Sequence, residues 1–249
     1  MTLAYDGTDF RGWQRQPGLA TIQGLIQDAC QRILGGPTRV VGASRTDAGV
    51  HALRQVASLN VTSSLAPRAV MRALNAVLPS TIRVRDAREA LAGFDARRWA
   101  RGKRYAYLLD RGPYADPFLR RYAWHVPHEL DPDAMRQAFD AVRGKHDFSA
   151  FCAAAGRGRT PVCVVRAVRI VSRKTKLAIL ISADSFLHHM VRNLVGSLVE
   201  VGRGAERPEW MVELLNGRDR TRAGPTAPPQ GLTLVRVMYP GRSGDEVPR

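Results

Sequence analysis

At 249 residues the chain is long enough for one large domain or two smaller ones, each with its own hydrophobic core. Hydrophobic residues make up 45% of the chain and charged residues 24%, which is the composition of an ordinary globular protein. Lys and Arg number 38 against 22 Asp and Glu, and the formal net charge of +16 favours a polyanionic partner such as nucleic acid. Charge alone does not exclude a basic protein that binds no nucleic acid.

The three cysteines, Cys30, Cys152 and Cys163, lack the spacing of metal ligands, and their odd number leaves one unpaired in any disulfide scheme. The first residues lead into a strand and a turn, and they do not resemble a signal peptide. No apolar run approaches the roughly 20 residues needed to cross a bilayer. We therefore expect a protein of the reducing cytoplasm.

The first part of the chain predicts an α+β unit. Residues 2–6 form a short strand, and apolar side chains at helical spacing from Ile22 to Ile33 indicate a helix with Thr21 as its cap and Gly35 at its end. Strands follow over residues 39–41 and 56–61, then a helix over 67–78 with proline in its first turn, then a strand over 82–85. The order strand, helix, strand, strand, helix, strand is typical of an α+β fold.

Residues 12–16 place Trp13 among hydrogen-bonding and cationic side chains, including Arg15. This mixture suits RNA, because tryptophan stacks on bases while arginine reaches phosphate. A surface loop whose tryptophan is anchored in the core explains the same pattern equally well.

Residues 41–52 hold one carboxylate, Asp47, between two potential cations, Arg45 and His51, with glycines on both sides. A carboxylate that phosphates must approach weakens binding by repulsion, so catalysis is one reason for its presence. The alternative is a turn-forming aspartate, since Asp-Ala-Gly is favourable turn chemistry. Either way, residue 47 is expected on a loop between two strands, where a rigid sheet can hold it.

The second part of the chain begins with a strand over residues 104–109, in which Tyr105 and Tyr107 share one face. Only one of these rings is expected to reach an active site, and both belonging to the core is the alternative. Further elements are a helix from about Pro132, a hairpin over residues 162–171 and 177–182, helices over 186–201 and 210–215, and a strand over 232–239.

Two features of this part concern binding. The small, glycine-rich segment 153–159 predicts a mobile loop, and its Arg157 and Arg159 suit phosphate contact. In the helix over 186–201, the four-residue spacing of His188 and Arg192 would put both on one face. His188 and His189 would point in different directions, so we expect no shared metal there.

The sequence contains no P-loop, no dinucleotide-binding glycine motif after a strand, and no His/Cys cluster of zinc type. These observations predict a protein without cofactor or metal.

The run Ser44-Arg45-Thr46-Asp47-Ala48-Gly49-Val50-His51-Ala52 resembles the active-site motif of the TruA-type tRNA pseudouridine synthases. Three further stretches agree with this family in order and rough spacing: Tyr5-Asp6-Gly7 with Gly12-Trp13-Gln14-Arg15-Gln16, then Arg104-Tyr105-Ala106-Tyr107, then Phe186-Leu187-His188-His189-Met190-Val191-Arg192-Asn193. The resemblance spans about residue 4 to residue 239.

The resemblance implies an α+β fold in which two related halves form a continuous, mostly antiparallel sheet flanked by helices, with a central basic cleft. We expect residues 1–98 to form the first half, residues 99–240 the second, and residues 241–249 a disordered tail. The family works as a homodimer without a cofactor, and its partner is tRNA.

By the same resemblance the chain isomerises uridine to pseudouridine at positions 38, 39 and 40 in the anticodon arm of tRNA. Asp47 corresponds to the catalytic aspartate, Arg192 to the arginine that pairs with it, and Tyr105 to the aromatic residue that meets the flipped uracil. Arg45 would fill the space that the base leaves. Arg97 lies in a segment similar to one that contacts tRNA, although Asp95 stands where some members have histidine.

Two other functions fit the sequence. One is a non-catalytic RNA-binding protein on the same fold, against which the intact Asp47, Tyr105 and Arg192 argue. The other is a pseudouridine synthase with a different RNA target, selected by the 153–159 loop.

Overall fold

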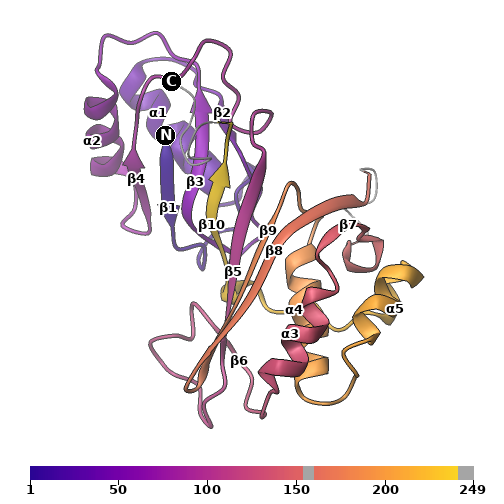
Figure 1. Cartoon of the computed structure of the whole chain (residues 1–249). Coiled ribbons are helices and arrows are strands. Elements are labelled where there is room, and N and C mark those ends of the chain that lie inside the picture. The colour runs from indigo at the N-terminus through magenta and orange to yellow at the C-terminus, as the bar shows by residue number, and fades with distance from the viewer. Residues whose placement is uncertain (154–159, 241–249) are drawn as a thin grey trace. The chain divides into compact units, whose positions relative to one another are not determined.

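The computed structural model describes residues 1–153 and 160–240, so the predicted phosphate contacts of Arg157 and Arg159 and the predicted disordered tail lie outside the described residues. The chain forms two compact units (Figure 1). Among the described residues, the first comprises Met1–Lys103 together with residues 233–240, and the second comprises Arg104–Leu232. The prediction divided the chain once, near residue 98, whereas the structure returns the last strand to the first unit.

The first unit contains a sheet with the strand order β4-β1-β3-β10, and β2 also pairs with β3. These strands are β1 (Thr2–Tyr5), β2 (Val40–Gly42), β3 (His51–Leu59), β4 (Ile82–Asp86) and β10 (Leu232–Met238). Strand β1 runs antiparallel to both β3 and β4, whereas β10 is parallel to β3, with Thr233 opposite His51. Strand β3 begins at His51, directly after the loop that carries Asp47.

Two helices in the first unit pack against each other, and both begin and end as their sequences predict. In α1 (Ile22–Leu34) the Thr21 side chain accepts a hydrogen bond from the amide of Gly24, and Gly35 adopts a φ of 74° at the end. In α2 (Pro67–Val77) proline occupies the first turn. Asn75 of α2 exchanges two hydrogen bonds with the backbone of Val84, and this covers the edge strand β4.

The second unit has the strand order β5-β9-β8-β7, with β6 parallel to β5. The strands are β5 (Gly102–Asp110), β6 (Trp124–His125), β7 (Gly144–Asp147), β8 (Val162–Arg173) and β9 (Lys176–Ala183). Strands β8 and β9 form the predicted antiparallel hairpin, and Lys174 at its tip has a φ of 50°. The short strands β6 and β7 were not predicted, because their sequences carry little apolar pattern.

Helices α3 (Pro132–Asp140), α4 (Met190–Gly202) and α5 (Trp210–Gly217) gather on one side of β8 and β9 (Figure 1). Asp131 caps α3 by accepting hydrogen bonds from the amides of Asp133 and Ala134. Almost every residue of α4 is buried, so this helix is the centre of the second core. Single-turn 3₁₀ helices cover Ser149–Phe151, Arg220–Arg222 and Pro229–Gly231.

The predicted α+β class, with a mostly antiparallel sheet flanked by helices, is confirmed. One helix boundary is wrong: α4 begins at Met190, because His189 has a φ of 61° and cannot continue a right-handed helix. His188 therefore lies outside the helix, so the predicted placement of His188 and Arg192 on one helical face is wrong. None of the described helices is both long and apolar enough to span a bilayer.

Candidate active site

The Asp47 loop (residues 43–50) connects β2 to β3 in the first unit. Side chains alternate along it: Ser44 and Thr46 are buried, Arg45 is exposed and Asp47 is half-buried. The amide of Val50 donates to the carbonyl of Asp47 at 3.2 Å and closes a tight turn before β3. The loop thus carries one half-buried carboxylate and one exposed guanidinium between two strands, as predicted.

The fully buried side chain of Gln55 in β3 holds the start of the loop. Its Oε1 accepts from the amide of Ser44 at 3.1 Å, and its Nε2 donates to the carbonyl of Ser44 at 2.7 Å. The same Nε2 donates to the phenol oxygen of Tyr5, which lies 2.8 Å from the hydroxyl of Thr46. Because these buried polar groups are all paired, they fix the backbone on both sides of Arg45.

The segment from Gly7 to Trp13 holds the loop from its other side. The amide of Trp13 donates to the carbonyl of Thr46 at 3.0 Å, and the amide of Gly49 donates to the carbonyl of Phe10 at 3.4 Å. Gly12 has a φ of 82°, and a Cβ atom there would lie 2.7 Å from the carbonyl oxygen of Thr46. Only glycine allows this approach without moving the residues that flank Asp47.

His51 follows the loop as the first residue of β3, and its ring is buried. Its Nδ1 lies 3.1 Å from the amide nitrogen of Gly7 and 3.2 Å from Oδ1 of Asp6. One nitrogen cannot accept from the amide and donate to the carboxylate at once, so only one of these two contacts is a hydrogen bond of the ring. Oδ1 of Asp6 also accepts from the amide and the hydroxyl of Thr8, and these bonds fix the turn after β1.

Trp13 is only 1% exposed, and its ring packs so closely on Gly42 that a Cβ there would lie 2.3 Å from it. The suggested base-stacking role of Trp13 is therefore not supported, and the alternative of a core anchor accounts for its position. Arg15 is exposed and forms an ion pair with Asp28 at 3.2 Å. Arg97 is also exposed, in a turn whose amide donates to the carboxylate of Asp95. Both arginines are exposed, and contact with RNA stays a prediction for each.

In the second unit, Tyr105 and Tyr107 lie on one face of β5 but have different surroundings. Tyr107 is fully buried, and its hydroxyl donates to the carbonyl of Pro228 at 2.7 Å. Tyr105 is 6% exposed, and its ring meets Phe186 edge-to-face at a centroid distance of 5.1 Å. Both rings are thus buried, as the core alternative expects, and the catalytic role of Tyr105 stays a prediction.

Arg192 lies in the first turn of α4 and is half-buried. Its Nε donates to the carbonyl of Ala227 at 2.7 Å, and its own carbonyl accepts from the amide of Ala227 at 3.1 Å. These two hydrogen bonds fix Arg192 relative to the segment that follows Arg222. The structure thus places Asp47 and Arg45 in the first unit, and Tyr105 and Arg192 in the second.

A buried polar network beside Arg192 was missed by sequence reasoning. Asn193 is fully buried: its Nδ2 donates to the carbonyl of Phe151, and its Oδ1 accepts from Arg220 and Thr226. Burial lowers the pKa of Arg220. A buried asparagine inside an otherwise apolar helix is the signal that could have revealed this network.

The rings of His188 and His189 lie 4.0 Å apart between centroids at an interplanar angle of 32°, so the prediction that they point in different directions is wrong. The left-handed conformation of His189 turns its side chain back beside that of His188. This geometry follows from the backbone at the helix start and has no signal in the sequence pattern.

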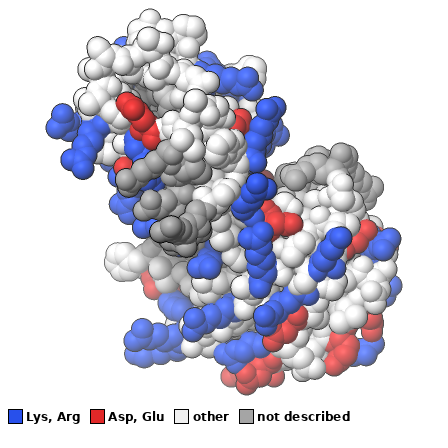
Figure 2. Space-filling view, turned by 45° about the horizontal axis from the view of Figure 1, so that its top comes forward, with Lys and Arg blue, Asp and Glu red and all other residues white. Residues whose placement is uncertain are grey.

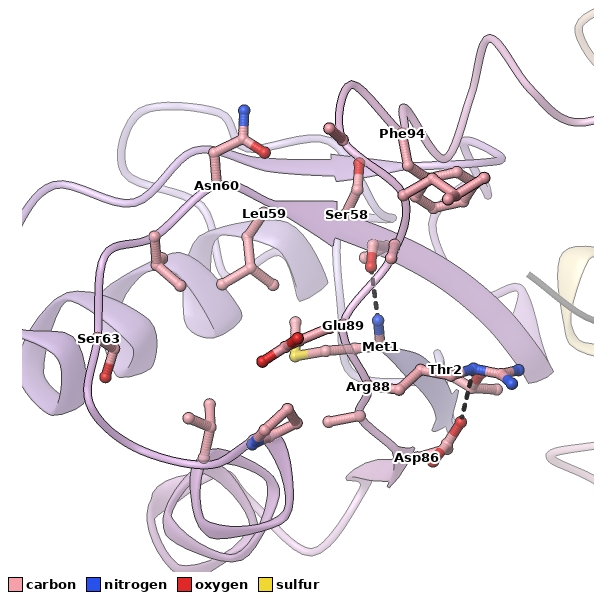
Figure 3. A pocket seen from close by; sticks show the side chains of 18 of the residues that line it. Met1, Thr2, Ser58, Leu59, Asn60, Ser63, Asp86, Arg88, Glu89 and Phe94 are labelled. Atoms are coloured by element: carbon pink, nitrogen blue, oxygen red, sulfur yellow. Dashed lines mark hydrogen bonds and ion pairs between the residues drawn. The ribbon is translucent and has the colours of Figure 1, made fainter. Parts of the chain in front are cut away.

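The first unit also contains a cavity of about 420 Å³ between the segments 57–67 and 86–94 (Figure 3). The side chains of Met1 and Glu89 project toward its centre, and Arg88 pairs with Asp86 at its rim. None of the residues predicted to be functional lines it. The cavity is thus separate from the Asp47 loop.

Cationic side chains are spread over the visible face of both units, with fewer acidic ones between them (Figure 2). The formal net charge of +16 favours a polyanionic partner such as nucleic acid. The charge and the exposed arginines fit a protein that acts on nucleic acid.

Comparisons with known proteins specify the family. The model of the tRNA pseudouridine synthases matches residues 1–97 and 138–240. The tRNA pseudouridine synthase A of Myxococcus xanthus is 43% identical over 240 residues, which cover 96% of this chain and 91% of that protein. The corresponding proteins of Caldicellulosiruptor bescii and Geobacter sulfurreducens are 40% and 43% identical over 239 residues, covering 96% of this chain and 98% of each relative. The chain belongs to the tRNA pseudouridine synthase family.

Proposed function

We propose that this chain is a tRNA pseudouridine synthase that isomerises uridine by means of Asp47. The observation that carries the proposal is the Asp47 loop itself, in which buried hydrogen bonds from Gln55 and Tyr5 and the close contact with Gly12 fix the residues that precede the carboxylate. A turn-forming aspartate needs no such support from three distant parts of the chain. The identity of about 40% to curated synthases over 96% of the chain supports the same conclusion.

The reaction breaks the bond between N1 of uracil and C1′ of ribose, turns the base, and joins C5 to C1′. A proton leaves C5 and N1 gains one, so the atoms balance without a redox step. A carboxylate serves as the covalent nucleophile that keeps the intermediate bound between the two bond changes. The target base must first leave its stack, because a side chain cannot reach it inside a helix.

Each remaining residue has a role in this scheme. By the family resemblance, Arg192 corresponds to the arginine that pairs with the catalytic aspartate. Tyr105 contacts the flipped uracil, and Arg45, exposed two residues before Asp47, occupies the space that the base leaves. Arg15 and Arg97, both exposed, contact phosphate.

The finer features of the proposal rest on the family resemblance. The substrate is the anticodon arm of tRNA with uridines at positions 38, 39 and 40, and the enzyme works in the cytoplasm as a homodimer. A dimer would let one subunit bind the arm while the other supports the body of the tRNA.

Asp47→Asn tests the central claim, because it removes the nucleophile but keeps the size of the side chain. We expect no pseudouridine by chemical mapping of tRNA, with tRNA affinity within a few fold of wild type. Asp133→Asn is the matched control, since Asp133 is an exposed aspartate of the second unit. Full activity of Asp47→Asn would contradict the assignment. Mapping total RNA from cells with and without the protein distinguishes the anticodon arm from another RNA target.

A further inference from the structure

The second unit displays two aromatic side chains almost completely to solvent. Tyr114 is 86% exposed and Phe118 is 87% exposed, whereas the other exposed large hydrophobic side chains of the described residues reach 53% at most. Both lie in the segment 111–122 between β5 and β6, together with Tyr122, which is 42% exposed. Large rings left in water on a well-formed segment point to a binding surface.

The segment is held in a defined conformation by the buried carboxylate of Asp110 at the end of β5. Asp110 accepts from the amides of Gly112 and Asp116 at 3.1 and 3.0 Å and from Nζ of Lys176 at 2.8 Å. Asp116 in turn accepts from the amide of Phe118 at 2.9 Å. The two aromatic rings are therefore presented by a fixed backbone, which lowers the entropy lost when they bind a partner.

The tip of the β8–β9 hairpin is joined to this segment. Arg111 donates from Nη2 to the hydroxyl of Ser172 at 2.7 Å and to the carbonyl of Lys174 at 2.8 Å, and its amide donates to the carbonyl of Thr175. Lys176 bridges Asp110 and Asp116 at 2.8 and 3.4 Å. Two segments distant in sequence thus form one surface.

Three exposed side chains on this surface carry a positive charge. Arg120, Arg173 and Lys174 are exposed, and the carboxylate of Asp116 is paired with Lys176. We call this set the aromatic–basic surface; it consists of Tyr114, Phe118, Arg120, Tyr122, Arg173 and Lys174. Aromatic rings interleaved with cations suit RNA, because unpaired bases stack on the rings while phosphates meet the cations.

We propose that the aromatic–basic surface is a second RNA-contacting site, which binds unpaired nucleotides of the tRNA away from the target uridine. This inference rests on the proposed function for the identity of the RNA. A second copy of the chain fits this surface less well than RNA does. Two such cationic surfaces repel each other, and the three cations interrupt the apolar area. The surface contributes to the affinity for tRNA and takes no part in the isomerisation of uridine.

The double variant Tyr114→Ala/Phe118→Ala tests the stacking contribution, and the exposed rings make it compatible with folding. We expect tRNA affinity to fall at least about tenfold, since each stacked base contributes substantially to binding. Val212→Ala, an exposed apolar residue of α5 in the same unit, is the control and should bind like wild type. Thermal melting of each variant verifies that the fold is kept.

Salt dependence tests the cations separately. Replacing both Arg120 and Arg173 by Ala should reduce the slope of log affinity against log salt by about 2, whereas the aromatic double variant should leave the slope unchanged. Affinity within twofold of wild type for the aromatic variant, or an unchanged slope for the arginine variant, would overturn the proposal. So would a switch from dimer to monomer by light scattering in the aromatic variant, because loss of the dimer would itself explain weaker tRNA binding. If the wild-type protein binds tRNA but makes no pseudouridine, the proposed function is contradicted. The tRNA affinities of the two double variants then still decide whether this surface binds RNA.

Discussion

The phenol oxygen of Tyr5 lies 2.8 Å from the hydroxyl of Thr46, the residue immediately before Asp47. This bond joins strand β1 to the Asp47 loop across 41 residues of sequence. Burial raises the pKa of Tyr5 to about 12, although hydrogen bonds with Thr46 and Gln55 act in the opposite direction. The phenol is therefore neutral at physiological pH, and it both accepts from Gln55 and bonds to Thr46.

Tyr5→Phe should lower both stability and turnover. Loss of the hydroxyl leaves Gln55 and Thr46 without one partner, which costs about 1–2 kcal/mol of unfolding free energy. The loop that positions Asp47 loosens at the same time, so we expect kcat to fall more than the affinity for tRNA. Tyr239→Phe is the matched control, because its buried hydroxyl donates to the carbonyl of Ala96 far from the loop. Equal kcat values for the two variants would show that Tyr5 stabilises the fold without positioning Asp47.

Gly12→Ala should damage the same loop from its other side. The new methyl group would lie 2.7 Å from the Thr46 carbonyl and 3.1 Å from the Ala48 amide nitrogen, so the backbone around Asp47 must move. Gly18→Ala is a close control: its φ of 70° is comparably strained, but no atom lies within 4 Å of the new Cβ. We expect both variants to lose about 1 kcal/mol from backbone strain, and only Gly12→Ala to lose most activity. Comparable activities would contradict the proposed contact.

Arg192→Lys keeps the positive charge but removes the planar guanidinium and its bond to the Ala227 carbonyl. If the guanidinium assists Asp47, kcat/KM should fall by about a hundredfold or more, in the range seen when one charge-stabilising donor is removed. Arg203→Lys makes the same exchange at an exposed position just after the same helix and should keep full activity. A loss confined to thermal stability would assign Arg192 a structural role only.

Acid should loosen the end of β5 through Asp110. Burial by itself raises the pKa of this carboxyl, but hydrogen bonds from Lys176, Asp116 and Gly112 outweigh it and lower the pKa to about 2 from the usual 3.8. Because the folded pKa lies below the unfolded one, the stabilisation is present above about pH 4 and is lost as the pH falls toward 2.

Asp110→Asn should therefore be less stable than wild type at pH 6, and the difference should shrink between pH 4 and 2. Urea unfolding at a series of pH values measures this directly. Asp133→Asn, an exposed aspartate in the same unit, is the control. A constant difference across this range would show that the Lys176 pair does not stabilise the folded state.

The sequence predicted helix ends correctly where they depend on hydrogen bonds between neighbouring residues. Thr21 and Gly35 gave the ends of α1 within a residue, because capping bonds involve neighbours only. The helix over 186–201 was predicted four residues too long, since apolar spacing continues through Phe186 while the backbone at His189 adopts a left-handed conformation. Apolar periodicity does not report the conformation of a single residue.

The candidate site shows the same division. The motif around Asp47 and the match over residues 186–193 were visible in the sequence, and the family they indicated is confirmed. Trp13 could not be assigned, because exposed and buried tryptophans occur among the same neighbours; only its packing on Gly42 decided between them. No sequence pattern marked Gln55, although its two hydrogen bonds to the backbone of Ser44 hold the start of the loop.

By itself the sequence determined the fold class, the ends of several elements and the carboxylate around which the proposed chemistry is built, since these depend on neighbouring residues or on an extended motif. The tertiary structure alone decided which distant side chains hold that carboxylate, which tryptophan and tyrosine rings are enclosed, and that Tyr114 and Phe118 share a surface with the hairpin tip. The physical reason is that contacts such as Gln55 to Tyr5 or Arg111 to Lys174 join residues that the fold brings together. Spacing along the chain does not encode those distances.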